Sequence, residues 1–83
     1  MANKKINEKV TVTSLGFRKN LNVYPRCMEF NGKTYKFIDS GLSYLVRYGE
    51  RLAEFITLSD GKADFYLRSD NRGASWTLLS ICS

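Results

Sequence analysis

The chain has 83 residues, of which 43% are hydrophobic and 25% charged, and its formal net charge is +5. A chain of this length folds as one small domain, which excludes a deep catalytic cleft between two domains. The apolar content excludes intrinsic disorder, and no apolar run approaches the ~20 residues of a membrane-spanning helix. Since no apolar segment follows the charged N-terminus, as it would in a secretory signal, we expect a cytoplasmic protein that does not contact a membrane.

The N-terminal end is the most basic part of the chain. Residues 1–20 contain five basic residues and one acidic residue, and the remainder is close to balanced. The polar stretch 1–8 predicts a flexible basic tail, ahead of a single small β domain over residues 9–83. Lys9 to Thr13 alternates polar and β-branched residues, the two-residue period of a half-buried strand. Pro25 lacks an amide hydrogen and therefore belongs at the edge or the start of a strand.

A hairpin is predicted around Asn31-Gly32. This dipeptide favours a two-residue type I′ turn, because both central residues of that turn need positive φ angles. The turn pairs Phe30 with Lys33 and Met28 with Tyr35. In this register four apolar side chains share one face, which we expect to be the core face: Met28, Phe30, Tyr35 and Phe37.

The stretch 41–57 fits two structures. Its apolar residues follow a helical spacing and Ser40 is a possible N-cap, which indicates a helix. A glycine at position 49 would destabilise that helix by about 1 kcal/mol, and the stretch is rich in strand-forming residues. We favour strands over 43–47 and 52–58, joined by a tight turn at Tyr48 to Arg51.

The last third of the chain predicts two more strands. Asp60-Gly61 is a second type I′ signal. Residues 62–68 then alternate, with Phe65 and Leu67 facing the core and Tyr66 and Arg68 facing solvent, and residues 76–81 form the last strand. The predicted fold is mainly β, a small antiparallel barrel or rolled sheet of about five or six strands. The alternative is an α+β fold in which a helix over about 41–57 packs on the sheet.

The segment between these two strands contains a recognisable pattern. Ser69-x-Asn71-x-Gly73-x-Ser75-Trp76 resembles the Asp box, Ser-x-Asp-x-Gly-x-Thr-Trp, with Asn71 in place of Asp and Ser75 in place of Thr. In sialidase-like propellers this motif caps a β-hairpin away from the catalytic centre, so the resemblance implies a structural turn formed by Ser69, Asn71, Gly73 and Trp76. It does not imply sialidase activity, because the chain is too short for several propeller blades. The alternative role is a ligand or partner contact through Arg68, Asp70 or Arg72.

Residues for catalysis are not apparent. The absence of histidine excludes Ser-His and Cys-His nucleophilic pairs. Cys27 and Cys82 are too few for a zinc site and are predicted to be free thiols, with a disulfide as the alternative. The aspartates at 60, 64 and 70 are predicted to serve turns and the surface, because their spacing is not that of a calcium loop. We therefore expect no enzyme, no catalytic residue, no metal and no small-molecule cofactor.

Two functions remain. The first is a non-enzymatic protein-interaction module that binds a protein partner or forms a homodimer through an exposed edge strand. The alternative is a nucleic-acid-binding module, because small β domains bind single strands with basic and aromatic side chains. Its candidate residues are the basic Lys4, Lys5, Lys9, Arg18 and Lys19 and the strand residues Arg47, Tyr48 and Tyr66.

Overall fold

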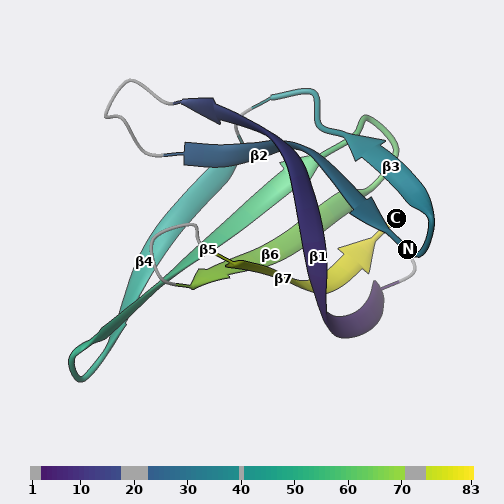
Figure 1. Cartoon of the computed structure of the whole chain (residues 1–83). Helices are drawn as coiled ribbons and strands as arrows, with labels where there is room; N and C mark the ends of the chain where they lie inside the picture. The colour runs from purple at the N-terminus through teal and green to yellow at the C-terminus, as the bar shows by residue number, and fades with distance from the viewer. Residues whose placement is uncertain (1–2, 18–22, 40, 71–74) are drawn as a thin grey trace.

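The computed structural model describes residues 3–17, 23–39, 41–70 and 75–83, and these ranges contain seven β-strands and no helix. The strands are shown in Figure 1: β1 (Asn3–Phe17), β2 (Val23–Phe30), β3 (Lys33–Lys36), β4 (Leu42–Tyr48), β5 (Arg51–Ser59), β6 (Asp64–Asp70) and β7 (Ser75–Cys82). The mainly-β prediction is confirmed, with more strands than the five or six expected. The alternative helix over about 41–57 is wrong, since β4 and β5 occupy that stretch and meet in a turn at Gly49-Glu50.

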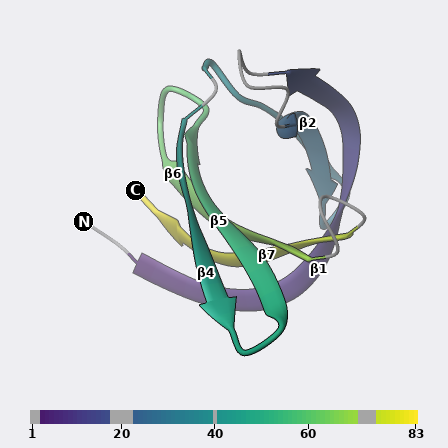
Figure 2. The same ribbon diagram turned by 90° about the vertical axis from the view of Figure 1, so that its left-hand side faces the viewer.

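All seven strands belong to one antiparallel sheet in the order β3-β2-β1-β7-β6-β5-β4. The sheet curves around a common interior, as the end-on view in Figure 2 shows. It does not close into a barrel, because β3 and β4 remain as its two edges. A hydrogen bond from the Ile38 amide to the Ser59 carbonyl, at 2.9 Å, links the segment after β3 to the end of β5.

Strand β1 joins the two halves of the sheet. Its first part pairs with β7, from Asn3 opposite Cys82 to Val10 opposite Trp76, and its second part pairs with β2. The prediction of a flexible tail over residues 1–8 is therefore wrong for residues 3–8. A register shift between Lys5 and Glu8, where Asn7 has a φ of 55°, bends the strand there. The polar composition of residues 3–8 gave no strand signal in the sequence, because main-chain pairing with β7 needs few apolar side chains.

The core lies inside the curve of the sheet. It contains seven buried side chains from β2, β5, β6 and β7: Met28, Ile56, Leu58, Phe65, Leu67, Trp76 and Leu78. The β2–β3 hairpin covers this core, and the rings of Tyr35 and Phe37 lie 5.0 Å and 5.3 Å from the ring of Phe65. The face predicted for Met28, Phe30, Tyr35 and Phe37 is confirmed, since all four pack in or against the core.

The turns follow the sequence signals in part. Asn31 and Gly32 have φ angles of 52° and 75°, and Phe30 pairs with Lys33, which confirms the predicted two-residue turn. The Asp60-Gly61 signal instead marks a longer loop, since Ser59 pairs with Asp64. Here the Asp60 side chain accepts hydrogen bonds from the amides of residues 62 and 63, at 2.8 and 2.9 Å. This side-chain turn satisfies backbone donors that a two-residue loop would not expose.

The Asp-box-like segment joins β6 to β7. Ser69 pairs with Trp76, and Asp70 pairs with Ser75. Ser69 and Trp76 are both buried, and Trp76 belongs to the core. Asn71 and Gly73, which the motif places inside the turn, lie outside the described residues.

Candidate interaction surfaces

The two edges of the sheet differ in length and chemistry. Strand β3 has four residues, and its first and last residues are the exposed lysines Lys33 and Lys36. Short strands and lysines are common means by which proteins prevent pairing at a sheet edge. Strand β4 has seven residues, and Arg47 is its one charged side chain. Of the two edges, β4 is therefore the one without such protection.

Strand β4 also exposes apolar side chains on both of its faces. Leu42 is 80% exposed and Tyr44 63%, and both lie on the face away from the core. Leu45 lies on the opposite face and is 64% exposed. On the neighbouring β5, Leu52 is 48% exposed. Figure 1 shows that the β4–β5 hairpin extends beyond the other strands at lower left, so this edge is accessible to another molecule.

The side of the sheet that faces away from the core is named the outer face below. Cross-strand pairing places two rows of side chains across it. The first row runs from β4 to β1 through Tyr44, Phe55, Arg68, Thr77 and Lys9. The second row runs parallel to it through Leu42, Thr57, Tyr66, Ser80 and Lys5. Together the rows contain three cations, three aromatic rings and no carboxylate.

The aromatic side chains of the first row form a stack. The rings of Tyr44 and Phe55 lie 5.5 Å apart with an angle of 14° between their planes. Phe55 is half-buried beneath the more exposed Tyr44, and it lies directly opposite Arg68 on β6. The stack lies at the β4 end of the outer face.

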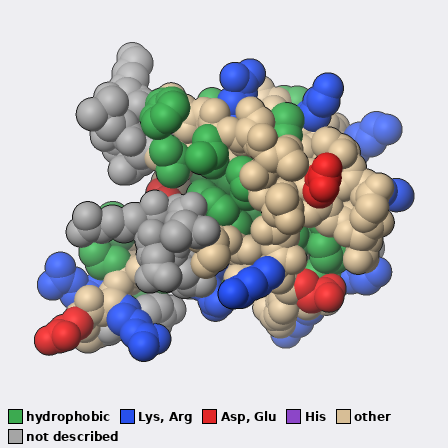
Figure 3. Space-filling view, in the orientation of Figure 1, with side chains coloured by type: hydrophobic (Ala, Val, Ile, Leu, Met, Phe, Trp, Pro, Cys, Tyr) green, Lys and Arg blue, Asp and Glu red, His purple; other side chains and the backbone are tan. Residues whose placement is uncertain are grey.

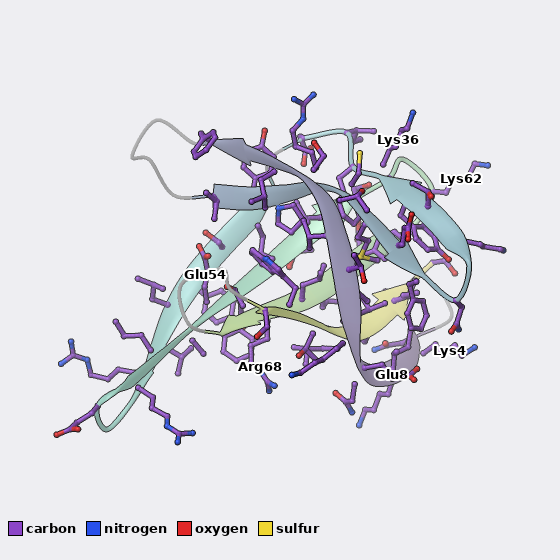
Figure 4. The ribbon with its side chains drawn as sticks, in the orientation of Figure 1. Lys4, Glu8, Lys36, Glu54, Lys62 and Arg68 are labelled. Carbon is purple, nitrogen blue, oxygen red and sulfur yellow. The ribbon has the colours of Figure 1, made fainter. Side chains whose placement is uncertain are left out.

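Arg68 occupies the middle of the outer face. Figure 4 shows it on the lower side of the sheet, with Glu54 on the upper side, as the strand register requires. The side chain is half-buried and its Nε atom is covered by neighbouring atoms. Ala53 and Thr77, which lie near it on the same face, are also buried. Long arginine side chains commonly cover sheet surface in this way while keeping the charged end near solvent.

The structure brings together part of the predicted nucleic-acid set. Lys5, Lys9 and Tyr66 lie on the outer face, on β1 and β6. Lys4 pairs with Ile81 and lies on the other face of β1, while Arg47 pairs with Leu52 at the end of the β4–β5 hairpin. Arg18, Lys19 and the side chain of Tyr48 lie outside the described residues.

Three outer-face residues were absent from that predicted set: Tyr44, Phe55 and Arg68. The alternation of residues 62–68 placed Arg68 on the solvent side, which was a usable signal. No comparable signal existed for Tyr44 and Phe55, because their position depends on the pairing of β4 with β5 and of β5 with β6. Figure 3 shows Lys and Arg side chains spread around the face that it draws, so net charge alone does not locate a binding face.

The described residues provide little for other chemistry. Cys27 and Cys82 are half-buried free thiols on β2 and β7. Within the described ranges, no group of three or more Cys, Asp or Glu side chains is arranged to hold a metal ion. In the same ranges, no helix has the length and apolar character to cross a membrane.

No protein-family model matches this chain, and searches of curated proteins and of solved structures find no match.

Proposed function

We propose that the protein is an interaction module that associates with a second copy of itself by antiparallel pairing of the two β4 strands. The observation that carries this proposal is the combination of length, exposed apolar side chains and low charge on β4. Strand addition at a sheet edge obtains affinity from main-chain hydrogen bonds and specificity from alternate side chains. Among the described strands, β4 has a neighbour on one side only, which leaves its other side for a partner strand.

A second copy suits the chemistry of this edge. With a two-fold axis at Leu45, each Leu45 lies opposite its counterpart, and Tyr44 lies opposite Val46 of the second copy. The same register places Arg47 opposite Ser43 of the second copy, so the charged residue of β4 does not meet its own counterpart. Like charges directly opposite each other would oppose pairing. A two-fold interface of this kind closes on itself and does not propagate into a fibre.

The apolar side chains supply the driving force. Pairing covers Leu42 and Tyr44 on the outer face and Leu45 on the opposite face, all of which are more than half exposed in the isolated chain. Removing apolar surface from water contributes about 25 cal/mol per Å².

Sedimentation equilibrium over a range of concentrations tests this proposal. We expect the wild-type protein to sediment as a dimer, and Leu45→Lys to sediment as a monomer because two lysines would face each other at the axis. Thr34→Lys, which adds the same charge at the exposed β3 edge, is the matched control and should remain dimeric. A monomeric wild-type protein at about 1 mM, where an association of −4 kcal/mol would be detected, would contradict the proposal.

A charge-complementation experiment identifies the paired residues. Leu45→Lys and Leu45→Glu should each be monomeric alone and should form a heterodimer when mixed, because opposite charges then meet at the axis. Far-UV circular dichroism of each variant establishes that the sheet is retained. Folded variants that stay monomeric when mixed would show that Leu45 does not lie at the two-fold axis.

A further inference from the structure

The outer face of the sheet combines two kinds of side chain whose chemistry suits one polymer. The first row has the Tyr44–Phe55 stack at its β4 end and Lys9 at its β1 end, with Arg68 between them. The second row contains Tyr66 and has Lys5 at its β1 end. The aromatic rings therefore lie on β4, β5 and β6, and the cations lie on β6 and β1, within five adjacent strands of one face.

The cations provide charge for a polyanion. Lys5 and Lys9 are exposed and lie on the same face of β1, on either side of its bulge. Arg68 adds a third positive charge near the centre of the face, and the two rows contain no carboxylate. Asp64, at the first end of β6, is exposed and lies next to the second row. The carboxylate of Asp64 therefore limits the positive surface on that side.

The aromatic side chains distinguish between polyanions. Tyr44 is largely exposed, its ring is held parallel to that of Phe55, and Tyr66 is half-exposed in the adjacent row. Exposed rings fixed on a sheet are platforms on which nucleobases stack, independently of base identity. An acidic peptide has no nucleobases, so the exposed rings would have nothing to stack against. A double helix keeps its base faces stacked inside and could use only the cations.

The two rows together form a band whose size fits a short single strand. With strands about 4.8 Å apart, five adjacent strands cover roughly 19 Å from β4 to β1. We propose that this band binds single-stranded nucleic acid, with bases stacked on Tyr44 and Tyr66 and phosphates neutralised by Lys5, Lys9 and Arg68. Tyr44 lies on β4, where the proposed dimer covers it, so stacking on Tyr44 belongs to the monomer. The other four residues lie on β6 and β1 and do not depend on dimer formation.

Fluorescence anisotropy with a labelled, mixed-sequence single-stranded oligonucleotide tests the phosphate contacts. We expect binding at low salt whose log K falls linearly with log salt concentration. The double variant Lys5→Ala/Lys9→Ala should reduce the slope by about 1.4, because each lost phosphate contact on a single strand contributes about 0.7. The control Lys33→Ala/Lys62→Ala has the same net charge as the first double variant, but it removes two exposed lysines that lie away from the band. It should leave the slope unchanged. An equal effect of both double variants, or no binding at low salt, would overturn the proposal.

The same assay tests base stacking. Tyr66→Leu should weaken binding about tenfold without changing the salt slope, since it removes a ring and no charge. Tyr66→Phe retains the ring and should bind like the wild-type protein. Circular dichroism of both variants establishes folding. Unchanged binding of a folded Tyr66→Leu variant would show that Tyr66 does not contact the bases. Unchanged binding of Tyr44→Leu as well would show that no base stacks on this face.

Competition with other polyanions completes the test. Duplex DNA and a poly-glutamate peptide should displace the labelled strand only at higher concentration than an unlabelled single strand. Equal or stronger competition by the duplex or by the peptide would show that the band recognises charge alone, and would overturn the assignment to single strands.

Discussion

The backbone conformation at position 41 requires glycine. It lies immediately before β4 with a φ of 64°, and its amide donates a hydrogen bond to the Asp39 carboxylate at 2.9 Å. A side chain there would overlap the carbonyl oxygen of Thr57 on β5. Glycine therefore allows the chain to approach β5 closely at the point where β4 begins.

Replacing Gly41 with alanine should lower the free energy of unfolding by at least about 2 kcal/mol, because strain at positive φ is added to a backbone overlap. Gly49 is a matched control, since its φ is 59° and a Cβ atom would meet nothing within 4 Å. Gly49→Ala should therefore cost only about 1 kcal/mol. Urea unfolding measures the stability of both variants. Equal decreases in the free energy of unfolding would mean that the close approach to Thr57 does not add to the cost of the Gly41 substitution.

At the scale of single elements, strand β1 shows what a polar sequence can conceal. Residues 3–8 pair with β7 and contribute Ile6 to the surroundings of the core. The two hairpins around Asn31-Gly32 and Gly49 were predictable, because their turn residues have positive φ angles that few other residues adopt. The N-terminal half of β1 was not, because its partner strand lies at the other end of the chain.

Deletion of residues 1–6 should destabilise the protein by about 2 kcal/mol or more, since it removes β-ladder pairs and the packing of Ile6. The control Lys4→Ala/Lys5→Ala removes charge but keeps the strand, and should stay within about 0.5 kcal/mol of the wild-type stability. Thermal unfolding followed by circular dichroism measures both. A deletion variant as stable as the wild-type protein would restore the interpretation of this segment as a flexible tail.

On the scale of the whole molecule, one core receives side chains from every described strand except β4. Its buried residues come from β2, β5, β6 and β7, and partly buried side chains of β1 and β3 pack against them. Trp76, the only tryptophan of the chain, lies in this core. A single core in a small domain favours cooperative unfolding.

We therefore expect urea unfolding followed by Trp76 fluorescence and by far-UV circular dichroism to give the same midpoint and slope, because tryptophan environment and strand content are lost together. Trp76→Ala should cost roughly 3 kcal/mol or more. If the fluorescence transition preceded the loss of strand signal, the core around β7 would unfold separately from the rest of the sheet.

Sequence alone determined where the type I′ turn lies and which side chains of residues 62–68 face the core, and it favoured strands over 43–47 and 52–58. These features depend on local φ preferences and on the two-residue period of a strand, both of which are readable over a few positions. Only the tertiary structure decided that Lys9, Arg68 and Tyr44 share one row, that β1 begins at Asn3 and that β4 is an exposed edge. Pairing between distant segments sets all three, and its register is determined by how the whole sheet buries its core.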